Sequence, residues 1–182
     1  LELALGDPFI RTWAFTPARL TNFLQGEGSF QPVLTLFTAM FMHGGLGHIA
    51  GNLLFLWVFG QAVEDAFGRR MYLLFYLTCG VAANLAQYAV NPDSQIINLG
   101  ASGAIAGIMG AYLAMYPRSS IDLFVWPLSL VVRNLHVPAW LMLGLWFATQ
   151  VSLGLAGLDG VGDTGGVAYI AHVGGFITGF AL

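Results

Sequence analysis

Charged side chains are scarce in this sequence of 182 residues. Asp, Glu, Lys and Arg together make up 8% of it, whereas hydrophobic residues make up 57%. Soluble domains carry roughly 25% charged residues, so the composition predicts a protein that lies in a lipid bilayer. None of the six basic residues is a lysine, and the nine acidic residues leave a net charge of −3. A charge this small, without a basic cluster, argues against nucleic acid as a partner.

Cysteine occurs once, as Cys79, inside an apolar run. A single cysteine excludes an intramolecular disulfide and makes thiol chemistry an improbable function. The sequence also lacks the basic flank of a signal peptide, since it starts with the short apolar stretch from Leu1 to Leu5. We therefore expect residues 1–6 to be the end of a first membrane helix.

Long uncharged blocks are the main positive feature. A membrane-spanning helix needs about 20 mainly apolar residues, and five blocks approach that length: 46–63, 71–90, 99–116, 137–158 and 165–182. They predict an all-α membrane protein that forms one domain over residues 1–182. Residues 7–45 are expected to be an external loop that is partly embedded, with Pro32 to Met42 in the membrane. Asp159 to Thr164, which contains two glycines, is interpreted as a mobile cap.

The arginines suggest an orientation. Arg69 and Arg70 lie in one connection between blocks, and Arg118 and Arg133 lie in the next connection but one. Cytoplasmic loops carry an excess of basic residues, so both connections are predicted to be cytoplasmic. Arg11 and Arg19, which would be outside, weaken this prediction.

Two helices carry stripes of small residues at matching spacing. In block 99–116 the stripe is Gly103, Gly107, Gly110 and Ala114, and Ser102 lies beside it. In block 165–182 the corresponding stripe is Ala168, His172, Gly175 and Gly179. Small residues let helix backbones approach closely, so packing of these stripes would bring Ser102 to His172. A serine beside a histidine is a nucleophile beside a base.

Two further polar residues are expected at the same depth. His48 and Asn52 lie one turn apart near the outer end of block 46–63. With the backbone N–H of Ser102 they are placed to stabilise an oxyanion. Every acidic residue lies in a loop or in the N-terminal segment, so we expect a catalytic dyad of Ser102 and His172 instead of a triad.

Each of these residues also has a structural interpretation. A serine among glycines commonly holds membrane helices together, and Asn52 is equally suited to a hydrogen bond between helices. His172 fits a hydrogen-bonded structural histidine about as well as a functional one, although polar groups inside the membrane are costly. The joint pattern and the predicted topology favour the catalytic interpretation.

Three motifs together resemble the rhomboid family. Residues 42–52 (MHGGLGHIAGN) are similar to its second-helix motif, residues 100–103 (GASG) to its nucleophile motif and residues 171–176 (AHVGGF) to its third motif. The resemblance implies a six-helix bundle, of which this chain holds five complete helices and the end of the first. It also implies cleavage of single-span membrane proteins in or near their transmembrane segments, with the site open to the non-cytoplasmic side. Finally it implies an oxyanion role for His48 and Asn52 and no cofactor.

The sequence departs from some relatives at two places. Leu34 and Thr35 stand where those relatives carry a Trp-Arg pair in the embedded loop. Ala106 stands where an aromatic residue stacks on the histidine, so something else must hold His172. In block 137–158, Trp140, Leu143 and Phe147 are interpreted as a lateral gate toward lipid, and Trp146 as a packing or interface residue.

Other functions compete with the protease. A catalytically silent relative would bind transmembrane helices in the same groove without cutting them. A metal site of His43, His48 and His172 is a further possibility, but the sequence lacks His-Glu-x-x-His, and we expect no metal. A transporter would need ionisable residues along a path through the bilayer, whereas the polar residues gather near one face.

Overall fold

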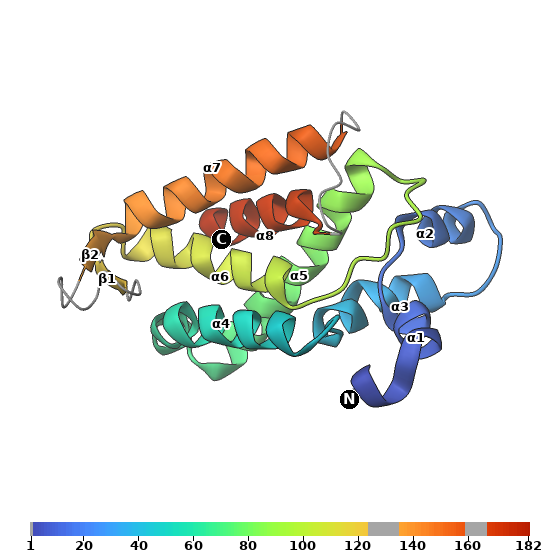
Figure 1. Cartoon of the computed structure of the whole chain (residues 1–182), viewed down its shortest axis with the longest axis horizontal. Coiled ribbons are helices and arrows are strands. Elements are labelled where there is room, and N and C mark those ends of the chain that lie inside the picture. The colour runs from blue at the N-terminus through green and yellow to red at the C-terminus, as the bar shows by residue number, and fades with distance from the viewer. Residues whose placement is uncertain (1, 124–134, 159–166) are drawn as a thin grey trace.

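The computed structural model describes residues 2–123, 135–158 and 167–182 of the chain. The helices from the middle and the end of the chain form a bundle, and the short N-terminal helices gather at one end of it (Figure 1). The elements in chain order are α1 (Glu2–Trp13), α2 (Pro17–Leu24), α3 (Gln31–Thr38), η1 (Ala39–Phe41), α4 (Leu46–Phe67), α5 (Arg69–Val90), α6 (Ser102–Met115), β1 (Ser120–Leu123), β2 (Leu135–Pro138), α7 (Ala139–Leu158) and α8 (Tyr169–Ala181).

Among the described residues, three helices are long and apolar enough to cross a membrane. They are α4, α5 and residues Ala139–Gly157 of α7. All three were predicted as spans; α4 starts and α5 ends at the predicted residue, and the other bounds differ by a few residues at most. Their large exposed side chains are hydrophobic, as at Trp57, Leu74 and Leu145. In water these side chains would be costly to expose, so they fit contact with lipid acyl chains.

The two central helices are shorter than predicted. The sequence suggested helices over 99–116 and 165–182, but α6 has 14 residues and α8 has 13. The reason at α6 is Gly100, whose φ of +119° breaks the helical path and delays the helix to Ser102. At about 1.5 Å per residue, each helix covers roughly 20 Å of the ~30 Å hydrocarbon layer. The surrounding protein satisfies the backbone of the segment before α6, as non-helical backbone inside a membrane protein requires: the Gly100 N–H donates to the Ala39 carbonyl at 2.9 Å.

The N-terminal region is more helical than predicted. The predicted first helix ended at residue 6, whereas α1 continues to Trp13. The predicted loop at residues 7–45 contains α2, α3 and η1. Helices α2 and α3 each have a proline in the first turn, Pro17 and Pro32. A proline there forfeits no intrahelical hydrogen bond, so it begins a helix instead of ending one.

The N-terminal helices are tied to the bundle by polar contacts. The side chain of Asn84 on α5 donates to the Leu36 carbonyl at 2.9 Å, and Thr38 donates to the Trp13 carbonyl at 2.6 Å. Backbone bonds join Phe15 and Asn98 in both directions, at 3.0 and 2.7 Å. Thr35 is buried and bonds within its own helix, whereas Leu34 is largely exposed. The anchoring thus uses contacts other than the Trp-Arg pair of some relatives.

Glycines set the distance between α6 and α8, which lie side by side in the middle of the bundle (Figure 1). A Cβ atom added at Gly175 or Gly179 would overlap the backbone carbonyl of Gly103 or Gly107. On its other side α6 meets α5, where a Cβ at Gly103 would lie 2.6 Å from the Cβ of Ala83. Backbone contacts backbone here, so the two helices hold their polar side chains at short range.

A small antiparallel hairpin joins α6 to α7. Strand β1 pairs with β2 in the register that places Asp122 opposite His136, and these two exposed side chains form a hydrogen bond. The sequence predicted only a connecting loop here. The hairpin lies at the end of the bundle away from α1 to α3 (Figure 1).

Candidate active site

The loop before α6 sets the position of Ser102. Gly100 has a φ of +119°, a backbone conformation that residues other than glycine rarely adopt. A Cβ at Gly100 would also lie 2.6 Å from Nε2 of His48. Glycine is therefore needed both to turn the chain and to leave room for the imidazole. The turn makes Ser102 the first residue of α6, where its backbone N–H has no intrahelical acceptor.

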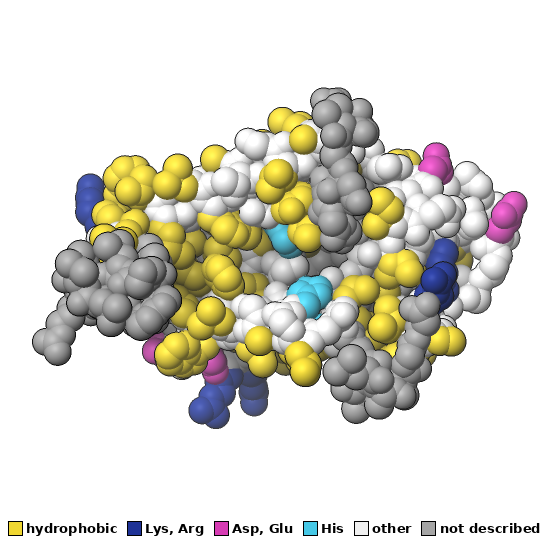
Figure 2. Space-filling model, viewed as in Figure 1, with side chains coloured by type: hydrophobic (Ala, Val, Ile, Leu, Met, Phe, Trp, Pro, Cys, Tyr) yellow, Lys and Arg dark blue, Asp and Glu magenta, His cyan; other side chains and the backbone are white. Residues whose placement is uncertain are grey.

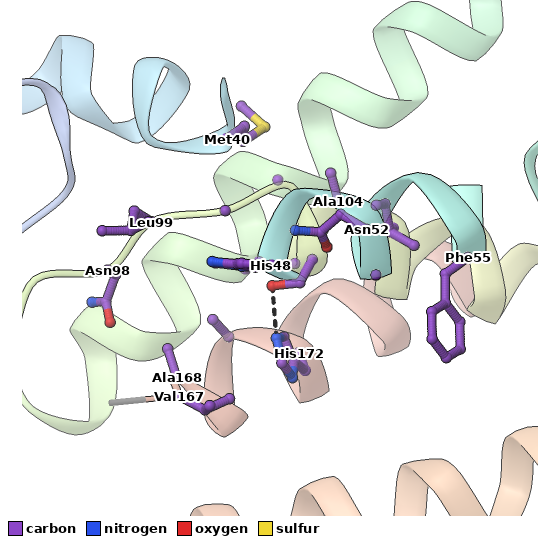
Figure 3. Close-up of a pocket in the computed structure, with 18 of the residues that line it drawn as sticks. Met40, His48, Asn52, Phe55, Asn98, Leu99, Ala104, Val167, Ala168 and His172 are labelled. Carbon is purple, nitrogen blue, oxygen red and sulfur yellow. Dashed lines mark hydrogen bonds between the residues drawn. The ribbon is translucent and has the colours of Figure 1, made fainter. Parts of the chain in front are cut away.

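Ser102 and His172 meet across the contact between α6 and α8. Oγ of Ser102 lies 2.8 Å from Nε2 of His172, and both side chains are partly buried. This bond is the dashed line in Figure 3. The structure thus brings together the two residues that the small-residue stripes predicted to be neighbours.

The second ring nitrogen of His172 faces α7. Nδ1 lies 2.8 Å from Oε1 of Gln150, and the indole of Trp146 stacks on the imidazole at 6.0 Å between ring centroids. An amide oxygen accepts hydrogen bonds and does not donate them. Nδ1 therefore carries the proton of the neutral ring, and Nε2 accepts from the Ser102 hydroxyl. Glu64 forms an ion pair with Arg69 and Asp122 forms one with His136, so neither carboxylate is the partner of His172.

Gln150 was not identified from the sequence. The available signal was its chemistry, since a carboxamide in the apolar block 137–158 is costly unless it finds a partner. Trp146 was interpreted only as a packing or interface residue. The two residues are one helical turn apart on α7, and Trp146 supplies the aromatic stacking on His172 that the alanine at position 106 cannot supply.

His48 and Asn52 supply hydrogen-bond donors near Ser102. The Gly44 N–H donates to Nδ1 of His48 at 3.3 Å, so the neutral imidazole carries its proton on Nε2. Asn52 is buried, and its Nδ2 has no hydrogen-bond partner among the described residues. Both side chains project from α4 toward the space above His172 (Figure 3). An unpaired buried donor is expensive, which is typical of a group that awaits a ligand or a reaction intermediate.

These four residues line one cavity of about 450 Å³. Its wall also includes backbone and small side chains of α5, α6 and α8, together with Trp146 of α7. Figure 2 shows the surface hollowed at this point, with histidine side chains visible in the hollow. The cavity is therefore open to solvent molecules, although it lies between apolar helices.

A comparison of the whole chain with profiles of known protein families decides which family it belongs to. The family profile described as "Rhomboid domain" matches residues 31–182. The chain belongs to the rhomboid family. The predicted family and the predicted all-helical membrane fold are thus confirmed.

Named rhomboid proteins resemble the chain at about 30% identity. Rhomboid protease GluP of Bacillus subtilis is 34% identical over 149 residues, which are 81% of this chain and 25% of GluP. Rhomboid-like protein 11, chloroplastic, of Arabidopsis thaliana is 32% identical over 146 residues, or 80% of this chain and 49% of the relative. Rhomboid protein 1, mitochondrial, of Saccharomyces cerevisiae is 28% identical over 154 residues, or 80% and 40%. The chain spans a quarter to a half of the length of these rhomboid relatives.

Three other interpretations of this rhomboid chain are not confirmed by the structure. The interpretation of Trp140, Leu143 and Phe147 as one lipid-facing gate is wrong in part, because Leu143 is fully buried in the core and Phe147 stacks on Phe176 at 4.7 Å. The predicted cap at 159–164 lies outside the described residues. No group of three metal-binding side chains occurs in residues 2–123, 135–158 and 167–182, so the metal interpretation gains no support.

Proposed function

We propose that the chain is an intramembrane serine endopeptidase of the rhomboid type. It hydrolyses peptide bonds in or near the transmembrane segments of single-span membrane proteins. The 2.8 Å contact between Ser102 Oγ and His172 Nε2, inside a cavity within a membrane bundle, is the observation that carries the proposal. The similarity to a relative named as a protease supports it.

The reaction begins with attack by Ser102. Its Oγ bonds to the carbonyl carbon of the scissile peptide while Nε2 of His172 accepts the hydroxyl proton. The protonated imidazole then gives that proton to the departing amine nitrogen, which leaves an ester between Ser102 and the new carboxyl end. Water attacks the ester with His172 again as the base, and the hydroxyl of Ser102 is regenerated.

The oxyanion of each tetrahedral intermediate needs donors that are already oriented. The N–H of Ser102, Nδ2 of Asn52 and Nε2–H of His48 suit this role, because within the described residues none of them donates to another protein group. Losing one such donor typically costs about 2.7 to 4 kcal/mol in the barrier. The site thus supplies a nucleophile, a base and an oxyanion pocket without a carboxylate.

The substrate class follows from where the cavity lies. In this proposal a peptide meets Ser102 at membrane depth, which fits the length of α6, because 14 residues are too few to cross the bilayer. A transmembrane helix hides its carbonyls in its own hydrogen bonds, so a substrate must unwind at the cut. The cavity belongs to the ends of α4, α6 and α8 that lie away from Arg69 and Arg70, which supports an opening on the non-cytoplasmic side.

The deciding experiment is cleavage of a single-span substrate by the protein in proteoliposomes. We expect cleavage by the unaltered protein, loss of it in Ser102→Ala and in His172→Ala, and no effect of metal chelators. Ser152→Ala and His136→Ala are matched controls, since both residues are exposed and lie outside the cavity. These controls should cleave as the unaltered protein does.

The outcome also separates the proposal from a silent relative. Intact substrate in every reaction, with folded protein that still binds the substrate helix, would favour a protein that only binds transmembrane segments. Cleavage that survives Ser102→Ala would contradict the dyad itself.

A further inference from the structure

Gln150 makes a contact that the proposed chemistry does not by itself require. Its Oε1 lies 2.8 Å from Nδ1 of His172, on the opposite side of the ring from Ser102. Gln150 is only 7% exposed. The large hydrophobic side chains on the exposed surface of the same helix include Trp140 and Leu145. A carboxamide in such a place is costly unless both of its polar ends are used.

The other end of the amide is also used, and this fixes its direction. Thr149 donates its only hydroxyl proton to the Trp146 carbonyl at 2.6 Å. Its oxygen is thereby left as an acceptor, and Nε2 of Gln150 donates to it at 3.4 Å. The amide nitrogen is thus held toward Thr149, and the amide oxygen is turned toward His172.

A polar chain with one direction results. It runs from the Ser102 hydroxyl to His172, from His172 to Gln150, from Gln150 to Thr149 and from Thr149 to a backbone carbonyl of α7. Each group donates a hydrogen bond to the next one. The last acceptor is a carbonyl, which has no proton to donate, so the chain of hydrogen bonds cannot run in the opposite direction. The imidazole is therefore restricted to the tautomer with its proton on Nδ1, which alone leaves Nε2 free to accept from a serine.

We propose that Gln150, oriented by Thr149, is the positioning residue that holds His172 in its base-competent tautomer, in the place that a carboxylate occupies in a triad. The inference rests on the proposed function, in which His172 is the base. A neutral amide fixes the tautomer without bringing a charge into the membrane, where an unpaired carboxylate would be expensive.

The same geometry gives α7 a second role. Trp146, one turn before Gln150, stacks on the imidazole with an interplanar angle of 30°. Both supports of the base therefore come from α7, whereas the base itself is on α8. Any displacement of α7 away from α8 removes the hydrogen-bond acceptor and the stacking ring together, and leaves His172 with the edge contact of Tyr169 on its own helix at 6.2 Å between ring centroids.

The test compares Gln150→Met with Gln87→Met. Methionine has nearly the length of glutamine but accepts no comparable hydrogen bond. Gln87 is a partly buried glutamine of α5 outside the cavity, so its replacement is a matched control. The first readout is the ¹⁵N spectrum of ring-labelled histidine in the detergent-solubilised protein, assigned to His172 by comparison with His172→Ala. The second readout is the separation of kcat from KM in substrate cleavage.

We expect a proton on Nδ1 of His172 in the unaltered protein and in Gln87→Met. In Gln150→Met the ring should shift toward the tautomer with its proton on Nε2, and kcat should fall by about tenfold or more with little change in KM. Thr149→Val should give a smaller fall. Combined with Gln150→Met it should add nothing, because Thr149 acts through Gln150.

Gln150→Glu keeps an acceptor and serves if the methionine variant does not fold. Its carboxylate would favour the protonated imidazole, so the acidic limb of the kcat/KM profile should move to higher pH. A proton on Nε2 in the unaltered protein, or a ring and a kcat unchanged in Gln150→Met, would overturn the inference. Absence of cleavage by the unaltered protein would instead count against the proposed function, and the tautomer would still be readable in the spectrum.

Discussion

Asn52 and Asn84 are buried asparagines of neighbouring helices, and they differ in one respect. Nδ2 of Asn84 donates to the Leu36 carbonyl, whereas Nδ2 of Asn52 finds no partner in the part of the chain that the structure describes. The first amide completes the last turn of α3, where carbonyls lack intrahelical donors. The second amide is left unsatisfied in the resting protein, which costs stability and is useful only if it binds something during the reaction.

Replacement of each by leucine should therefore have opposite effects on stability. Asn84→Leu leaves the Leu36 carbonyl without its donor and should lower the free energy of unfolding by about 1 to 3 kcal/mol. Asn52→Leu removes an unsatisfied donor and should leave that free energy unchanged or raise it. Thermal unfolding in detergent measures both.

Asn52→Leu should at the same time lower kcat by about 100- to 1,000-fold, the usual result of losing an oxyanion donor. Substrate cleavage kinetics on the same preparation would test this. A variant that is less stable yet fully active would show that Asn52 serves the structure and not the reaction.

At the scale of elements, the contact between α6 and α8 determines whether Ser102 meets His172. We expect Gly179→Ala to lower the free energy of unfolding by about 1 to 3 kcal/mol, because its Cβ would collide with the Gly107 carbonyl and the backbone has little freedom to yield. Cleavage activity should fall as well, since the two side chains are held at 2.8 Å by this packing.

Gly144→Ala is the matched control within the same bundle. Gly144 lies in α7, and a Cβ there meets nothing within 4 Å. Alanine is favoured over glycine in a helix by about 1 kcal/mol, so this variant should be at least as stable as the unaltered protein. Equal melting temperatures for the Gly179 and Gly144 variants would contradict the close packing of α6 and α8.

The same elements mark what the sequence can predict. The long helices α4, α5 and α7 were predicted because their apolar blocks reach the length of a span. The start of α6 was not, since an apolar block does not reveal where Gly100 takes a positive φ. Helix α3 was missed because a proline in the first turn looks like an interruption.

For the site, Ser102 and His172 were predictable because the spacing of small residues tells which faces meet. Gln150 was not, because an isolated polar residue in an apolar block has no direction until the rotation of α7 is known. The structure supplies that rotation through the contact of Gln150 with His172.

At the scale of the whole molecule, the arginines are unevenly distributed between the two ends of the bundle. Arg69 and Arg70 lie at the turn between α4 and α5, and Arg118 follows α6. At the end that carries the cavity, Arg19 donates to the Arg11 carbonyl at 2.8 Å and to Gln31 at 2.7 Å, so its charge serves the local fold. This distribution favours a cytoplasmic location for the end of the bundle that carries Arg69, Arg70 and Arg118.

Single cysteines would measure the orientation directly. Cys79 is fully buried, and Cys79→Ala gives a background without thiols. In that background, Asp93→Cys reports on the loop between α5 and α6, near the cavity, and Arg69→Cys reports on the opposite end; both native residues are exposed. A membrane-impermeant maleimide should label the first in intact spheroplasts and the second only after permeabilisation. The reverse pattern would mean that the cavity opens to the cytoplasm, and substrates would then have to present their cleavage site from that side.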